Sequence, residues 1–211
     1  MKAIIHPAYF PPVAHFVAMA HHDIIFEVSD NYQKQTYRNR TYVYSPNGKQ
    51  LLTVPVKHTK KDGRQRYRDV KIEYDFNWRK QHRKTLETIY RTSPFFEYYE
   101  DEIIPVFDKA PTYLIDLNFD TIQLICDCLQ LDFPPEKTTS YAETIPDATD
   151  LRNLSNAKKE PGFVFEKYDQ VFQEKHGFMG NLSILDLLFN QGPDAVNYLN
   201  RQKLSKASTG K

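Results

Sequence analysis

The residues best suited to chemistry lie in a cationic segment, Asn31 to Arg40. It carries Lys34, Arg38 and Arg40 among amides, a hydroxyl and tyrosines, and it contains no aliphatic side chain. Apolar runs on either side of it are predicted to be buried strands. An arginine can bind an anion through two parallel hydrogen bonds, and a lysine can bind it as a point charge. The segment is therefore predicted to bind phosphate, sulfate or carboxylate. The alternative is a solvated edge strand.

Several histidines could exchange protons. His6 follows the first apolar run, and Tyr9 and His15 lie in the loop and helix that come next, near the place where ligands usually bind in α/β units. His82 lies on the predicted inward face of a later helix. Imidazole is the side chain best placed to transfer protons near neutral pH, so His82 and His15 are the predicted catalytic residues. The alternative for His82 is a hydrogen-bonded core histidine.

The proline-rich entry into the first helix resembles that of class I nucleotidyltransferases. In that family a histidine at the helix start steadies the phosphates, and His15 stands near the equivalent place, although Ala14 replaces the usual glycine before it. Lys34, Arg38 or Arg40 would have to complete the phosphate clamp.

The strands and helices expected around these residues indicate an α/β fold. It consists of an N-terminal βαβ-type mixed sheet followed by a mainly helical C-terminal half. A strand at 3–5, a helix at 13–22 and a strand at 24–28 form a parallel βαβ unit. The turn at 45–49 predicts a hairpin between 42–44 and 51–56, and 70–74 is a further candidate strand. Helices are expected from residue 77, at 95–107, at 118–131 with Asn118 or Asp120 as cap, at 182–189 and at 195–199.

We expect a single domain over 1–211, mainly sheet-forming over 1–75 and mainly helical over 76–202, with a tail at 203–211. The polar stretch 132–162 is interpreted as a long connection that is either a lid or a poorly ordered loop.

Composition narrows the class of protein. The net charge is +1, so no nucleic-acid partner is expected. The longest apolar run is far shorter than the ~20 residues of a membrane span, and the N-terminus does not read as a signal peptide. Cys126 and Cys128, two apart on a helix, are expected to be packing thiols in a reducing compartment, so the expected location is cytoplasmic. No metal site is expected, and the sequence leaves the cofactor open.

Blocks along nearly the whole chain resemble the WbqC-like family, and its Bacteroidetes-type branch most closely. They are P-A-Y-F-P-P-V-A-H-F at 7–16, Y-Q-K-Q-T-Y-R-N-R at 32–40, L-L-T-V-P-V at 51–56, Trp78 with His82, Y-R-T-S-P-F-F-E-Y-Y at 90–99 and N-L-S-I-L-D-L-L-F-N-Q-G at 181–192. The family is named from genes in surface-polysaccharide (O-antigen) clusters, so the resemblance implies a role near sugar or nucleotide-sugar metabolism. The chain departs from the commoner pattern at His6, where many relatives have Gln, and at His15, where many have Tyr.

The resemblance also directs attention to Asn181, Ser183 and Asp186 as substrate-binding residues. The alternative is helix capping by Asn181 or Ser183, with Asp186 in the first turn, where a carboxylate suits the helix dipole.

Our first hypothesis is a transferase that acts on a nucleotide-sugar or sugar phosphate in surface-polysaccharide biosynthesis. The three cations of the 31–40 segment would hold the anionic end, and the orienting side chains would be His6, Tyr9, Tyr37 and Asn39. This hypothesis requires Tyr9, His82 and the three cations to converge on one concave pocket. The other hypothesis is a non-catalytic partner or scaffold protein with an exposed aromatic patch at 95–99.

Overall fold

A parallel sheet forms one part of the molecule. The computed structural model describes residues 1–57, 64–159 and 161–205. Of the tail predicted at 203–211, residues 206–211 lie outside the described residues. The strand order is β5 (Glu136–Lys137), β2 (Asp23–Phe26), β1 and β6 (Ala148–Asp150), and each neighbouring pair is parallel. β1 (Lys2–Ile5) has a neighbour on each side, and Ala3, Ile4 and Ile5 are all buried. Such a strand must be apolar throughout, which explains the opening run of the sequence.

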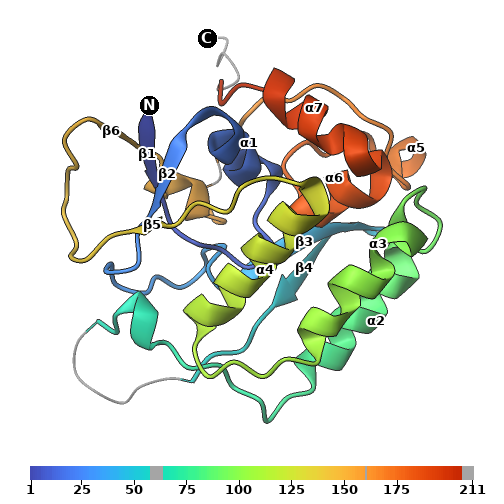
Figure 1. The fold of residues 1–211 in the computed structure, drawn as a ribbon. Helices are drawn as coiled ribbons and strands as arrows, with labels where there is room; N and C mark the ends of the chain where they lie inside the picture. Colours follow the sequence, from blue (N-terminus) through green and yellow to red (C-terminus); the bar gives the residue numbers. More distant parts are fainter. Residues whose placement is uncertain (58–63, 160, 206–211) are drawn as a thin grey trace.

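The first three elements confirm the predicted βαβ unit. Helix α1 (Val13–His21) connects β1 to β2 (Asp23–Phe26), and the two strands are in parallel register from the pair Lys2 and Asp23 onwards. The α/β class is likewise confirmed, because a parallel sheet and an antiparallel pair are combined with helices in the C-terminal half. Figure 1 shows the parallel sheet at one side of the molecule, and α2 (Trp78–Tyr90) and α3 (Phe96–Ile103) at the other.

The stretch 132–162, interpreted as a lid or a poorly ordered loop, contains regular structure over part of its length. This stretch supplies β5 (Glu136–Lys137) and β6 (Ala148–Asp150), which pair with β2 and β1 respectively. Both strands are short, and their side chains are mostly exposed, so no apolar alternation marks them in the sequence.

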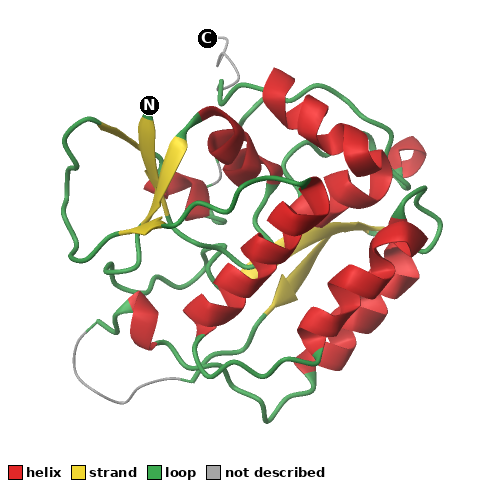
Figure 2. Ribbon diagram, in the orientation of Figure 1, coloured by secondary structure: helices red, strands yellow, loops and turns green. Residues whose placement is uncertain are grey.

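A separate antiparallel hairpin consists of β3 (Arg40–Ser45) and β4 (Gly48–Thr53), as the turn signal predicts. Gly48 has a φ of 94°, a conformation that glycine adopts without a steric penalty. Residues 70–74 form isolated bridges rather than a strand. Figure 2 shows the two groups of strands apart from each other, with helices around the hairpin.

The helices bury the faces that the sequence predicts. In α2 the buried side chains are Trp78, His82, Leu86, Ile89 and Tyr90, which is the predicted stripe. The remaining helices are α3 (Phe96–Ile103), α4 (Leu114–Leu129), α5 (Gln173–His176), α6 (Ile184–Gln191) and α7 (Ala195–Arg201), with 3₁₀ turns at Tyr67–Asp69, Ile104–Phe107, Arg152–Ser155 and Gly192–Asp194. No helix among the described residues is both long enough and apolar enough to cross a membrane.

Helix α4 begins at Leu114, earlier than predicted, and its N-cap is Tyr113. Asn118 and Asp120, the two predicted caps, lie inside the helix. Asn118 is fully buried, and its side-chain amide donates to the Arg38 carbonyl at 2.7 Å. Cys126 and Cys128 both carry free thiols, and burial raises the pKa of Cys126 to about 12.

Candidate functional site

The segment 31–40 is an irregular loop up to the start of β3, rather than an edge strand. Gln35 has a φ of 61°, which turns the chain in the middle of the segment. The loop sends the three cations to different places. Arg38 is buried with 1% of its surface exposed, Arg40 is partly buried, and Lys34 is exposed.

Arg38 lies in a buried polar cluster instead of facing a ligand. Its Nη2 donates to Asp30 Oδ2 at 3.1 Å, and its guanidinium lies 5.3 Å from the centre of the Tyr67 ring. His6 Nε2 lies 2.9 Å from the same Asp30 oxygen. Burial and the charge of Arg38 lower the pKa of His6 to about 4, so this imidazole is neutral near pH 7. Burial alone would raise the pKa of Asp30, but the bonds from His6 and Arg38 outweigh it and hold that pKa below its usual value.

This cluster borders a cavity of about 340 Å³ at the carboxyl ends of β1 and β6, where ligands of parallel sheets often bind. Arg152, which lines this cavity, is already bonded to Asp150 and to the carbonyls of Ala142 and Glu143. Both arginines at this edge are therefore neutralised by carboxylates, and the cavity is poorly suited to an anion.

In space, the side chains of Asp30, His6 and Ser155 follow one another as in the acid–histidine–serine triad of a hydrolase. Ser155 Oγ lies 3.3 Å from His6 Nδ1. However, the Ser155 hydroxyl donates to the Arg152 carbonyl at 2.9 Å, and Asp30 is shared with Arg38. The serine is thus not activated by this arrangement.

The predicted substrate-binding residues that do come together are Lys34, Asn39 and Arg40. They line a cleft of about 600 Å³, which we call the Arg40 cleft. Lys57 adds a third cation, and Glu73, 4.0 Å from Lys57, is the one carboxylate among the lining residues. The other lining residues are Tyr32, Gln35, Thr53, Val54, Pro55, Val56 and Phe76.

Arg40 is the most informative residue of this cleft. Its Nε is buried and has no hydrogen-bond partner among the described residues. Tyr32 lies close enough to feel its charge: burial raises the pKa of Tyr32 to about 12, while the Arg40 and Arg38 guanidinium groups act to lower it. Asn39 is fixed by a bond from its Nδ2 to the Val54 carbonyl at 2.9 Å.

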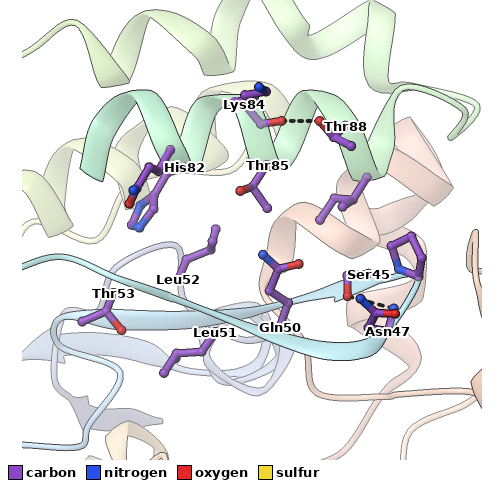
Figure 3. A pocket seen from close by; sticks show the side chains of 13 residues that line it. Ser45, Asn47, Gln50, Leu51, Leu52, Thr53, His82, Lys84, Thr85 and Thr88 are labelled. Carbon is purple, nitrogen blue, oxygen red and sulfur yellow. Dashed lines mark hydrogen bonds between the residues drawn. The ribbon is translucent and has the colours of Figure 1, made fainter. Parts of the chain in front are cut away.

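His82 and Tyr9 lie elsewhere. Tyr9 Oη is 2.9 Å from His82 Nδ1, and a further bond links the His82 ring to the backbone of Thr53. Burial lowers the pKa of His82 to about 4. This histidine lines a second cavity, of about 650 Å³, between β4 and α2, which we call the Gln50 groove (Figure 3). The catalytic role of His82 stays a prediction, because no observed contact tests it.

The first turn of α1 offers no free groups for a phosphate. Val13 N donates to the Leu182 carbonyl at 2.9 Å, and Ala14 N donates to Asn181 Oδ1 at 2.9 Å. His15 is 1% exposed, and burial lowers its pKa to about 3. The geometry expected from the nucleotidyltransferase resemblance is therefore absent among the described residues, and a catalytic role of His15 has no supporting contact.

Asn181, Ser183 and Asp186 have structural partners. Ser183 is the N-cap of α6, where its Oγ accepts from Leu185 N at 3.4 Å, so the capping alternative is confirmed for this residue. Asp186 is fully buried and accepts hydrogen bonds at 2.7–2.9 Å, the donors being Tyr90, Tyr168 and Gln170.

Tyr37 is also fully buried; its backbone bonds Tyr9 and Ser155. The five residues that the enzyme hypothesis places in one pocket are therefore distributed over three places: Arg38 in the buried cluster, Lys34 and Arg40 in the Arg40 cleft, and Tyr9 with His82 beneath the Gln50 groove.

Sequence reasoning did not single out Lys57, Tyr32 and Phe76. Tyr32 belongs to the cationic segment and could have been included on that ground. Lys57 and Phe76 carry no local signal, because only the packing of residues 54–57 and 73–76 beside the segment brings them to the cleft.

Comparison with known proteins agrees with the resemblance. The model of the WbqC-like protein family matches residues 6–160. The uncharacterized protein Rv1507c of Mycobacterium tuberculosis is 27% identical over 224 aligned residues, which cover 93% of this chain and 96% of that protein. No solved structure matches the chain.

Proposed function

The chain belongs to the WbqC-like protein family, and we propose that it is a transferase that binds a nucleotide-sugar or other phosphate-bearing small molecule in the Arg40 cleft. The connection to surface-polysaccharide biosynthesis rests on the family resemblance. The choice of ligand rests on the cleft itself.

The observation that carries the proposal is the state of Arg40. A guanidinium that lines a cleft and makes no hydrogen bond or ion pair among the described residues keeps its terminal N–H donors for a ligand. Lys34 and Lys57 line the same concave surface, and Glu73 compensates only part of their charge. A phosphate group would receive two parallel bonds from the arginine and point charges from the lysines.

The rest of the cleft suits the remainder of such a ligand. The side chain of Phe76 is 66% exposed at the cleft, so its ring can pack against a sugar or a base. Tyr32 and Asn39 bring a phenol and an amide to the same surface. Phosphate recognition by cations together with stacking on an aromatic ring favours a nucleotide-sugar or a sugar phosphate over a simple inorganic anion.

The two alternatives receive less support. For a class I nucleotidyltransferase-like activity, the start of α1 would have to receive phosphates, but its amides at Val13 and Ala14 are bonded to the segment before α6. For a scaffold protein, residues 95–99 would have to form an exposed aromatic patch. Phe96 and Tyr99 are buried, and only Tyr98 is largely exposed.

A thermal-shift screen tests the proposal. The ligands are nucleoside diphosphates, nucleotide-sugars and sugar phosphates, and the proteins are the wild type and the Arg40→Ala variant. A ligand that binds only the folded chain stabilises it by about 2.7 kcal/mol at a hundredfold excess over its Kd. We expect one ligand class to stabilise the wild type, and we expect Arg40→Ala to lose that gain.

Lys167→Ala is the matched control, because Lys167 is an exposed cation that does not line the Arg40 cleft. It should retain the full shift, which separates a local bond from the effect of net charge. A shift that is equal in Arg40→Ala and in the wild type would refute the cleft as the binding site. Arg38→Ala is less informative, because Arg38 is buried and its loss would disturb the fold.

A further inference from the structure

The Gln50 groove differs from the Arg40 cleft in its chemistry. Its walls are amides and hydroxyls, and Lys84 is the one side chain with a permanent charge among the lining residues. Figure 3 shows Gln50 and Leu52 of β4 pointing toward α2, and Thr85 and His82 of α2 pointing back toward the strand. A neutral polar cavity of this kind does not favour an anion.

The polar ends in the groove fall into two kinds. The amides of Gln50 and Gln81 and the hydroxyl of Thr85 have no hydrogen-bond partner among the described residues, so they are available to a ligand. Thr88 is different, because its hydroxyl donates to the Lys84 carbonyl of its own helix at 2.7 Å (Figure 3). An amide offers both donors and an acceptor, and a free hydroxyl offers both as well, which is what the hydroxyl groups of a sugar require.

The groove also offers apolar surface. Leu52 and Ile89 are buried side chains that line it beside the polar groups. A saccharide ring carries hydroxyls at its rim and C–H groups on its faces, so it matches such a mixed wall better than a uniformly polar or uniformly apolar molecule does. The volume of about 650 Å³ lies within the range of small-molecule sites.

Strand β4 separates the groove from the Arg40 cleft. Thr53, the last residue of β4, lines both cavities, and its side chain points away from α2 in Figure 3. The Thr53 backbone is in turn bonded to the His82 ring, so the two cavities meet at a fixed point of the fold. A ligand in the cleft and another in the groove would thus lie on the two sides of the same strand end.

We propose that the Gln50 groove binds a neutral saccharide beside the phosphate-bearing ligand of the Arg40 cleft. The inference rests on the proposed function only in taking the cleft as the anion site. The groove itself is argued from its own lining residues. Gln50, Gln81 and Thr85 would bond the sugar hydroxyls, and Leu52 with Ile89 would pack against a ring face.

The test is a glycan array of immobilised neutral and acidic saccharides, probed with the wild type, Gln50→Ala, Thr85→Val and Thr88→Val. Valine has nearly the shape of threonine, so each replacement removes a hydroxyl and little else. We expect the wild type to retain neutral glycans. Gln50→Ala and Thr85→Val should each weaken retention about 2- to 10-fold, the effect of one lost hydrogen bond. Thr88→Val should retain glycans as the wild type does, because the Thr88 hydroxyl is already bonded to the Lys84 carbonyl of its own helix.

The proposal is overturned if the wild type retains no neutral glycan, or if Thr85→Val and Thr88→Val weaken retention equally. Retention of acidic glycans alone, lost in Arg40→Ala, would also overturn it and would assign saccharide binding to the cleft. Arg40→Ala in the same array separates the two proposals. Arg40→Ala should still retain neutral glycans but should lose the thermal shift caused by nucleotide-sugars. The array therefore tests saccharide binding in the groove, and the thermal shift tests anion binding in the cleft, independently of each other.

Discussion

Replacing His15 with phenylalanine tests whether the folded chain holds its buried histidines in the neutral form. His15 is 1% exposed, and neither of its ring nitrogens has a hydrogen-bond partner among the described residues. Its ring lies against Tyr37, with the centroids 6.4 Å apart. Burial lowers the pKa of His15 to about 3 from 6.5, so the folded chain holds it neutral. Phenylalanine keeps the flat ring and removes the group that would be protonated.

The magnitude follows from linkage. The pKa of His15 is lower in the folded chain than in the unfolded chain, so its contribution to stability is present above pH 6.5 and is lost as the pH falls from 6.5 toward 3. Between pH 8 and pH 5.5 this loss is about 1.4 kcal/mol. His6 and His82, each with a pKa lowered to about 4, lose about the same amount over that interval. The three together amount to about 4 kcal/mol in the wild type, and the two that remain in His15→Phe amount to about 3 kcal/mol.

Urea unfolding, followed by circular dichroism at pH 8 and pH 5.5, measures both values. His21→Gln is the matched control, because His21 lies on the same helix and is exposed. It should lose as much stability on acidification as the wild type. If His15→Phe also loses as much as the wild type, His15 is not a buried neutral imidazole, and the reasoning fails.

Two further substitutions and one thiol modification test other parts of the structure. Asp30→Asn removes the carboxylate that balances the buried Arg38, so the free energy of unfolding should fall by about 3–5 kcal/mol in urea titrations; a loss below about 1 kcal/mol would show that Arg38 is solvated. Tyr168→Phe removes one donor from the buried Asp186 carboxyl and should cost about 1–3 kcal/mol by the same measurement, whereas an unchanged midpoint would contradict this bond. Cys126 is buried and burial raises the pKa of its thiol, so Ellman's reagent should modify it only after unfolding, and rapid modification of the folded chain would contradict its placement.

Much of the fold could be read from local patterns. The run Ala3–Ile5 is apolar at every position because β1 is buried on both faces of the sheet, and such a run is distinctive. The stripe of α2 was predictable for a similar reason, since burial on one helix face imposes a period of 3.6 residues. Strands β5 and β6 were not predictable, because their two and three residues are mostly exposed and show no apolar alternation.

The candidate site was predictable only in part. Sequence composition placed cations in the 31–40 segment, and the structure brings Lys34 and Arg40 to a common cleft. Sequence composition could not show that the side chain of Arg38, two residues before Arg40, turns toward the interior of the protein. That choice is made by Asp30, which lies close enough to neutralise a buried guanidinium.

The sequence by itself determined which segments are apolar enough to be buried and which segment is rich in cations, because both are properties of neighbouring residues. Only the tertiary structure decided the partner of each charge and the walls of each cavity. Lys57 reaches the Arg40 cleft, and Gln50 faces Thr85, through contacts between residues distant in the chain. The energy of a charge or an amide depends on what surrounds it in space, so its role is settled by packing and not by its neighbours in sequence.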